Sequence, residues 1–194
     1  MKIRNKAIFE PKPTIITDDP LIVFRMKPKF SLFFYNAFAY NPSSYSKFGG
    51  TFFKWIRIFC AKRIFKECGK ISTIDTHAYF GNGREVKIGD GSGIGANNHL
   101  PNNIIIGNDV MIGPDIYIVS NNHSFDRIDI PMNKQGIKGA EPTVVEDDCW
   151  IGARFILTPG RHVMNGSVIA AGPVLTKDIP EYSIAGGNPA KPIR

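Results

Sequence analysis

Aliphatic residues recur at every sixth position in two stretches of the chain. The first stretch carries Ile88, Ile94, Leu100, Ile106, Ile112 and Ile118, and the second carries Val145, Ile151, Leu157, Val163, Ile169 and Leu175. A helix repeats near 3.6 residues and an alternating strand near 2, so a strict spacing of six fits neither element alone. Small residues often follow the aliphatic one directly, as Gly89 and Gly152 do. The pattern predicts a solenoid of short parallel strands whose aliphatic side chains point inward and stack from coil to coil.

One insertion puts the two stretches out of phase. Ile118 and Val145 are 27 positions apart where the repeat needs 6, so 21 residues leave the coil within the segment 119–144. A long excursion from a rigid scaffold is often where function lies. This one begins with polar residues and contains His123. We therefore expect a protruding loop that carries functional side chains.

The N-terminal part of the chain lacks the sixfold pattern. We expect residues 1–69 to form an extension and residues 70–194 to form the solenoid domain. Within the extension, residues 51–67 are apolar and basic, which predicts an amphipathic helix that ends before Gly69. Such a helix either covers the open N-terminal end of the solenoid or lies on an anionic membrane surface. We expect the capping role and keep peripheral membrane contact as the alternative.

Composition and charge narrow the class of protein only partly. The chain has 194 residues, 43% of them apolar, which is ordinary for one soluble globular domain with an extension. Its net charge of +7 favours an anionic partner: a nucleotide cofactor, an acidic polysaccharide, a membrane surface or nucleic acid. Cys60, Cys68 and Cys149 form no CxxC pair, and the N-terminus lacks a signal-sequence pattern. A cytoplasmic location is therefore expected.

Four features together resemble the hexapeptide-repeat O-acetyltransferases. They are the two repeat stretches, the histidine within Asn-His-Ser-Phe-Asp at 122–126, the Trp-Ile-Gly at 150–152 that resumes the coil, and the ending Ala-Gly-Gly-Asn-Pro-Ala-Lys-Pro-Ile-Arg at 185–194. The resemblance covers residues 70–194 and is nearest to the maltose and galactoside type and its polysaccharide-modifying relatives. It implies an all-β fold, a left-handed parallel β-helix of hexapeptide repeats. It also implies a homotrimer that builds its active site between neighbouring subunits.

The resemblance implies transfer of an acetyl group from acetyl-CoA to a hydroxyl of a sugar or a surface-polysaccharide precursor. His123 matches the family's catalytic base, a role worth roughly 10² to 10⁴ in rate. The backbone N–H of Ala153 would stabilise the oxyanion of the tetrahedral intermediate. Because the family transfers the acetyl group directly, no cysteine nucleophile is needed. Cys149 occupies the small-residue position four after Val145 in the repeat and is interpreted as a core residue. Asp126 and Asp129 are candidates to orient the imidazole.

The resemblance also places coenzyme A. Its pantetheine arm would lie along the groove between neighbouring subunits, and its phosphates would meet basic residues near the C-terminus. The implied cofactor-binding residues are Trp150, Gly152, Ala153, Ala171, Thr176, Lys177, Lys191 and Arg194. Pro173 replaces a serine common in the family and lacks an N–H, so one pantetheine contact is in question. Asn97 falls near a position that binds the acceptor sugar and is predicted, with His123, to contact the substrate.

Two other functions share the predicted coil. A zinc hydratase of the γ-carbonic-anhydrase type needs three histidines converging on the metal. His77, His99, His123 and His162 are 22, 24 and 39 positions apart, so no close pair exists. A non-catalytic β-helix scaffold would lack a base, and His123 argues against it. We interpret the other three histidines as structural or solvated, and we expect a sugar acceptor without a metal or nucleic acid.

Overall fold

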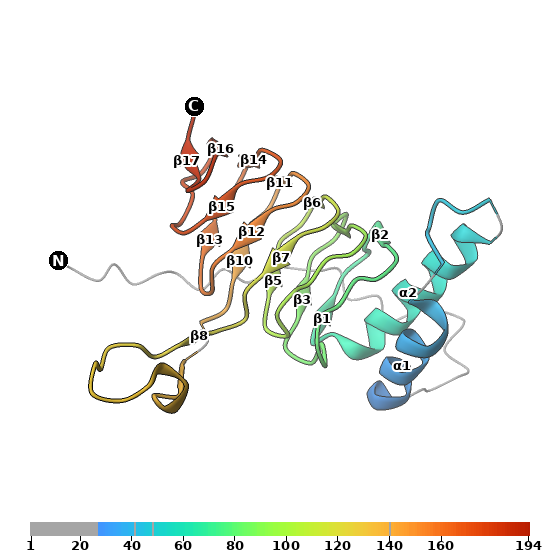
Figure 1. Cartoon of the computed structure of the whole chain (residues 1–194). Coiled ribbons are helices and arrows are strands. Elements are labelled where there is room, and N and C mark those ends of the chain that lie inside the picture. Colours follow the sequence, from blue (N-terminus) through green and yellow to red (C-terminus); the bar gives the residue numbers. More distant parts are fainter. Residues whose placement is uncertain (1–26, 41, 48, 140) are drawn as a thin grey trace.

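The computed structural model describes residues 27–40, 42–47, 49–139 and 141–194, which form a parallel β-helix closed at one end by helices (Figure 1). Residues 1–26, the first part of the predicted extension, lie outside the described residues. Three parallel sheets form the faces of the coil. Sheet A contains β1 (Glu67–Cys68), β3 (Lys87–Ile88), β5 (Ile105–Ile106), β10 (Val144–Val145) and β13 (His162–Val163). Sheet B contains β2 (Thr73–Ile74), β4 (Gly93–Ile94), β6 (Met111–Ile112), β11 (Trp150–Ile151), β14 (Val168–Ile169), β16 (Ile184–Gly186) and the antiparallel β17 (Lys191–Pro192). Sheet C contains β7 (Tyr117–Ile118), β12 (Ile156–Leu157) and β15 (Val174–Leu175).

The sixfold spacing corresponds to one face of the coil, and three spacings make one full turn. Ile88 is therefore the parallel partner of Ile106, 18 positions later. The second residue of nearly every two-residue strand points inward, and Ile74, Ile94 and Leu157 are fully buried there. Aliphatic residues stack on their own kind from coil to coil, which confirms the predicted β-helix and its core.

The first coil is longer than the others and begins earlier than predicted. Cys68 pairs with Ile88 and Ile74 with Ile94, a separation of 20 positions instead of 18. The two additional residues lie in the turn at 81–85, where Gly81 adopts a left-handed backbone with φ of 59°. They hide the register of the first coil from a search for strict sixfold spacing. The first strand of sheet A, β1, begins at Glu67, three residues before the solenoid start predicted at residue 70.

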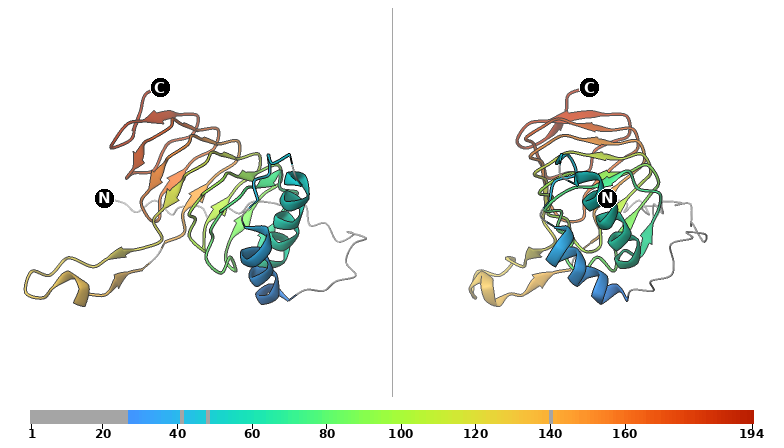
Figure 2. Two further views of the ribbon diagram at one scale, coloured as in Figure 1. Left: turned by 45° about the vertical axis from the view of Figure 1, so that its right-hand side comes forward. Right: turned by 90° about the vertical axis from the view of Figure 1, so that its right-hand side faces the viewer.

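The insertion forms an arm that projects from the coil between β7 and β10 (Figure 2). Its two strands, β8 (Asn122–His123) and β9 (Ile137–Lys138), pair antiparallel, and a short 3-10 helix, η2 (Met132–Lys134), lies between them. Val144 then resumes sheet A as the partner of Ile105. The protruding loop expected from the break in the repeat is confirmed, because the coil continues in register on both sides of it.

A helical cap closes the N-terminal end of the coil. It consists of α1 (Pro28–Phe34), a π-helical turn η1 (Tyr35–Ala39) and α2 (Gly50–Ile64). One face of α2 is buried and contains Ile56, Arg57, Cys60, Ala61 and Ile64. The helix ends at Ile64 instead of Glu67, because the backbone is extended at Phe65 and Glu67 already belongs to β1 of sheet A. Among the described helices, none is both long and apolar enough to cross a membrane.

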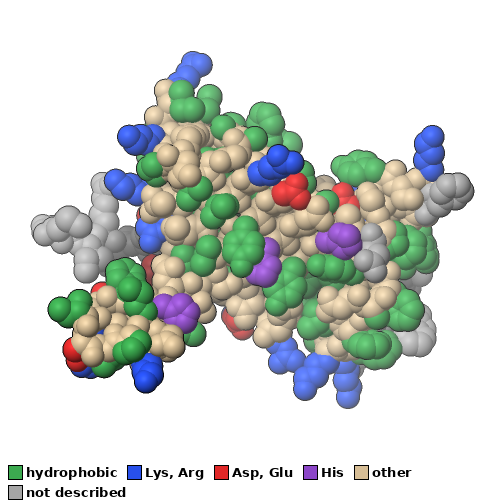
Figure 3. All heavy atoms as spheres, in the orientation of Figure 1, with side chains coloured by type: hydrophobic (Ala, Val, Ile, Leu, Met, Phe, Trp, Pro, Cys, Tyr) green, Lys and Arg blue, Asp and Glu red, His purple; other side chains and the backbone are tan. Residues whose placement is uncertain are grey.

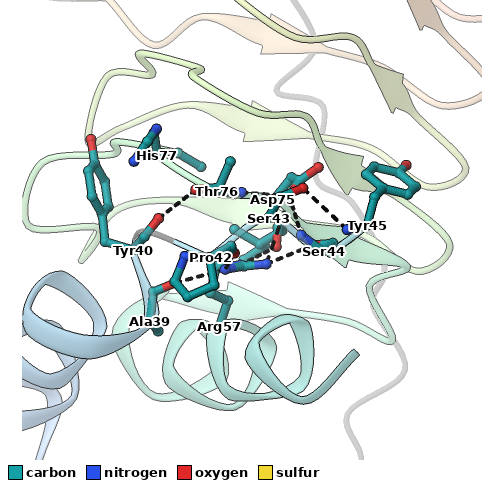
Figure 4. A network of polar contacts seen from close by, with 12 residues as sticks. Ala39, Tyr40, Pro42, Ser43, Ser44, Tyr45, Arg57, Asp75, Thr76 and His77 are labelled. Carbon is teal, nitrogen blue, oxygen red and sulfur yellow. Dashed lines mark hydrogen bonds and ion pairs between the residues drawn. The ribbon is translucent and has the colours of Figure 1, made fainter. Parts of the chain in front are cut away.

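The Arg57 side chain joins the cap to the first coil (Figure 4). It is fully buried, and its Nε–H donates to the carbonyl of Ile74 at 2.7 Å. Its terminal nitrogens donate to the carbonyls of Ala39 and Pro42 at 2.8 and 2.6 Å and to the Ser44 hydroxyl at 2.7 Å. Burial lowers the pKa of Arg57 and the nearby ionisable groups oppose that shift. A buried cation held by four hydrogen bonds fixes the position of α2 on the coil.

The carboxylate of Asp75 completes this network. It lies 3.8 Å from the Arg57 guanidinium and accepts backbone N–H bonds from Ser44 and Thr76 at 2.9 and 2.7 Å. Burial by itself would raise the pKa of Asp75. The two backbone N–H groups, the Ser44 hydroxyl and the Arg57 guanidinium together hold that pKa below its ordinary value. The cap is thus attached to the coil through polar groups that are satisfied on both sides.

Candidate functional site

His123 lies on the arm and is exposed to solvent. Its partner across the two-stranded ladder is Ile137. The imidazole makes no hydrogen bond to another described residue, and the arm extends away from the coil (Figures 1 and 2). The predicted base is therefore accessible, and no other part of the described chain covers it.

The two carboxylates expected to orient His123, those of Asp126 and Asp129, pair with cations of the arm instead. Asp129 receives two hydrogen bonds from the guanidinium of Arg127, and this exposed pair holds the pKa of Asp129 below its usual value. Asp126 lies 3.8 Å from the ammonium of Lys138. Neither carboxylate is placed to orient the His123 imidazole within this chain.

A polar hollow lies where the arm leaves the coil. Its volume is about 220 Å³, and it is lined by Asn122, Lys138, Gly139, Glu141, Pro159 and Arg161. His123 follows Asn122 in β8 but is not itself among the residues that line the hollow. Sequence analysis missed Lys138, Glu141 and Arg161. Only the folded arm brings Lys138 beside Arg161.

Ala153 lies at the corner between sheets B and C. The equivalent residues of neighbouring coils are Ala96, Pro114 and Ala171. Its carbonyl accepts from the N–H of Gly172 at 2.9 Å, whereas its own N–H donates to no other described residue. A side chain at the preceding Gly152 would come within 2.7 Å of the Ala171 backbone N. The corner thus needs small residues, and it presents a backbone donor that the coil does not use.

Asn97 lies at the same corner, two coils before Ala153. Its side chain bridges coils: the amide oxygen lies 3.1 Å from Nδ1 of His77, and the amide nitrogen donates to Asp115 at 2.9 Å. The arm leaves from a different corner, the one between sheets C and A. Within a single chain the structure does not bring Asn97 or Ala153 to the corner that carries His123.

The predicted cofactor-binding residues lie at three places. Trp150 is 54% exposed on the outer face of sheet B, and Gly152, Ala153 and Ala171 lie at the adjoining corner. Thr176 and Lys177 lie exposed at the corner from which the arm departs. Lys191 and Arg194 lie at the C-terminal end, where the tail folds back on β16. Pro173 is buried, so its missing N–H does not face the solvent.

The other histidines have structural partners. His99 lies between the rings of Tyr79 and Tyr117, at centroid distances of 4.6 and 4.5 Å, and burial lowers its pKa. His162 is buried, and its Nε2 lies 2.6 Å from a carboxylate oxygen of Glu146. These contacts agree with the structural interpretation of both side chains.

Cys149 is buried in the core, where desolvation raises the pKa of its thiol to about 11. A nucleophilic cysteine needs a lowered pKa and access to substrate, and Cys149 has neither. Across the described ranges, no group of three or more His, Cys, Asp or Glu residues is placed to hold a metal ion.

Comparison with known proteins identifies relatives of this arrangement. Residues 142–177 match the family described as the hexapeptide repeat of succinyl-transferase. A Schizosaccharomyces pombe protein named as an acetyltransferase is 44% identical to this chain over 91 residues. The matched residues cover 47% of this chain and 42% of that protein. The galactoside O-acetyltransferase of Lactococcus lactis is 35% identical over 134 residues, which cover 66% of this chain and 62% of that protein. The chain thus spans between two fifths and two thirds of the length of these curated relatives.

A solved structure extends the comparison to the fold. A hexapeptide-repeat acetyltransferase of Vibrio cholerae is 28% identical, covers 73% of this chain and 80% of its own, and superposes with a TM-score of 0.61. Its complex with acetyl coenzyme A superposes with a TM-score of 0.59. The coil, and not only the short matched stretch, is therefore shared with these proteins.

Proposed function

We propose that this chain is a hexapeptide-repeat acetyltransferase that transfers an acetyl group from acetyl-CoA to a hydroxyl of a sugar or a surface-polysaccharide precursor. The similarity to a solved acetyltransferase bound to acetyl coenzyme A carries the donor assignment. The similarity to a galactoside O-acetyltransferase supports the acceptor class. The unpaired cysteines support a cytoplasmic location.

In the proposed reaction His123 is the general base. A hydroxyl is a weak nucleophile at neutral pH, so the imidazole takes its proton while the new carbon–oxygen bond forms. The thioester oxygen becomes negative in the tetrahedral intermediate, and the N–H of Ala153, which has no partner among the described residues, donates to it. The carbon–sulfur bond then breaks, and the imidazolium returns its proton to the leaving thiolate.

A second copy of the chain is part of this proposal. His123 and Ala153 belong to different corners of one coil, so a neighbouring subunit would bring the arm of one copy to the corner of another. The outer face of sheet B supports such an interface, because Met111, Trp150 and Ile184 are 61%, 54% and 38% exposed along one line of strands. We propose a homotrimer, whose closed symmetry would repeat this contact around one axis.

The coenzyme A phosphates would meet Lys177, Lys191 and Arg194. All three side chains are exposed, so each contributes a charge that salt screens. Trp150, Gly152, Ala171 and Thr176 would line the path of the pantetheine arm. The acceptor would enter beside His123 and Asn122, and Asn97 would contact it only if a neighbour's corner is brought to the arm.

Release of free thiol from acetyl-CoA, measured with a panel of sugar acceptors, tests the proposal. His123→Ala should lower kcat by roughly 10² to 10⁴ and leave the KM for acetyl-CoA nearly unchanged. The matched variant with Lys177, Lys191 and Arg194 changed to Ala should instead raise that KM and largely preserve kcat. Near-normal turnover of His123→Ala on an accepted sugar would remove the base assignment. An unchanged KM in the triple variant would move the cofactor elsewhere.

A further inference from the structure

The positive charge of the protein is concentrated in the cap. Residues 20–66 contain nine Lys and Arg and no Asp or Glu, whereas residues 67–194 contain eleven Lys and Arg and fourteen Asp and Glu. The first region therefore carries a charge of +9 and the coil with its arm carries −3. Of the Lys and Arg residues in the described cap, only Arg57 is fully buried. The cations at its surface are Lys27, Lys29, Lys47, Lys54, Lys62, Arg63 and Lys66.

Large aromatic side chains lie among these cations. Phe30 and Phe33 on α1 are 55% and 63% exposed, and Phe52 and Trp55 on α2 are 59% and 49% exposed. Figure 3 shows hydrophobic side chains over the cap end of the molecule, with Lys and Arg side chains at its margins. Such a group of aromatic rings goes beyond the single exposed apolar residues that are normal on a protein surface.

The second helix has two apolar faces. The inward face seals the coil. Along the opposite side, the exposed Trp55 is followed at intervals of four residues by Phe59 and Arg63, which are half-buried, and Phe59 also packs against the core. The rings of Trp55 and Phe59 stack at 5.4 Å, and the guanidinium of Arg63 lies 3.5 Å from the centroid of the Phe59 ring. The helix was expected to be amphipathic, but its outward face is aromatic and basic instead of simply polar. Capping and surface binding are therefore roles of opposite faces and do not exclude each other.

We propose that the outward face of the cap, formed by α1 and α2, binds an anionic lipid surface. Trp and Phe beside Lys are the side chains that enter the interfacial region of a bilayer, and Lys near anionic lipid adds electrostatic attraction. Six of the seven surface cations are Lys. The Lys ammonium acts as a point charge and suits a diffuse anionic surface, whereas the Arg guanidinium favours bidentate pairing with a single carboxylate or phosphate. The cap lies at the end of the coil opposite the C-terminus, so a flat surface can reach it without contacting sheet B or the arm (Figure 1). The binding does not depend on acetyl transfer.

Vesicle binding by the whole chain tests this surface. Trp150→Phe leaves Trp55 as the only tryptophan. We expect this variant to sediment with vesicles of phosphatidylcholine and phosphatidylglycerol in equal amounts, with the Trp55 emission moving to shorter wavelength, and to be released by high salt. Vesicles of phosphatidylcholine alone should bind it far more weakly. Phe52→Ser should weaken sedimentation without changing the melting temperature, because this ring faces outward.

A matched pair of charge variants locates the contact. A variant in which Lys29, Lys54 and Lys62 are all changed to Gln should bind vesicles more weakly. Its dissociation constant should rise roughly fivefold for each lysine removed. The control changes Arg84, Lys134 and Lys138 to Gln, which removes the same charge from the coil and arm and should have little effect. Equal losses in both variants, binding without a shift in Trp55 emission, or no binding to the mixed vesicles would overturn the proposal. A further outcome would also overturn the proposal: the protein does not bind vesicles but self-associates, and Phe52→Ser abolishes that self-association. The face would then bind a second copy of the chain.

Discussion

The cap and the arm both lie outside the regular coil, but the cap is packed against it and the arm projects from it. The cap buries a continuous set of apolar side chains against the first coil and joins it through the enclosed Arg57 network. The arm is shaped by contacts within itself: the two-residue pairing of β8 with β9, and ion pairs whose side chains are more than half exposed. Only the arm carries a side chain that is both solvent-accessible and matched to the expected base.

The difference shows that the cap contributes more to the stability of the fold than the arm does. Exposed ion pairs contribute about 0 to 1 kcal/mol each, whereas removing one partner from a buried hydrogen-bonded charge costs about 3 to 5 kcal/mol. The cap is therefore an integral part of the fold, and the arm is an attachment whose final position depends on what it touches. In the proposed trimer, the neighbouring subunit supplies that contact.

The largest effect should follow from Arg57→Met. The substitution removes all four donated hydrogen bonds and leaves the carbonyls of Ala39, Pro42 and Ile74 without this donor in a buried setting. We expect a loss of about 3 to 5 kcal/mol in the free energy of unfolding, measured by urea denaturation at fixed protein concentration. Arg127→Met, its counterpart on the arm, should cost less than about 1 kcal/mol. Similar losses in the two variants would contradict the contrast drawn between cap and arm.

A smaller effect should appear in the dependence of stability on pH. The pKa of Asp75 is lowered in the fold, so its contribution is present above the unfolded pKa, about 3.9, and is lost as the pH falls through the folded value. Asp75→Asn should therefore be less stable than the wild type at neutral pH, and the difference should shrink below about pH 4. Asp129→Asn, on the exposed arm, should differ much less from the wild type. Parallel stability curves for the wild type and Asp75→Asn would show that Asp75 does not act through its charge.

The smallest effect on stability should come from removing the arm. Deleting residues 120–140 takes out 21 residues and restores the sixfold spacing between Ile118 and Val145. The new corner then has four residues, like the corner 158–161 one coil later. Chemical denaturation should show a change within about 1 kcal/mol, since few buried contacts are lost. Thiol release with a sugar acceptor should nevertheless disappear. A deletion variant that unfolds readily would mean that the arm supports the coil, and one that remains active would mean that His123 is not the base.

Much of the coil could be predicted from the sequence because its repeat is local. An aliphatic residue at each sixth position specifies an inward side chain on each face, and only a break in that spacing can mark an excursion. The break between Ile118 and Val145 therefore located the arm, and the burial expected for Cys149 followed from its place in the repeat. The first coil departs from the strict sixfold spacing because two additional residues near Gly81 shift its register.

The amino-acid sequence by itself determined the coil, the position of the arm and the residues that match a known chemistry, since each of these depends on spacing along the chain. Only the tertiary structure decided which corner each candidate occupies, that Asp126 and Asp129 pair with Lys138 and Arg127, and that α2 has two apolar faces. The physical reason is that corners, ion pairs and exposed faces depend on contacts between residues distant in sequence. A periodic pattern fixes which way a side chain points within its own coil, but not which side chain of another segment it meets.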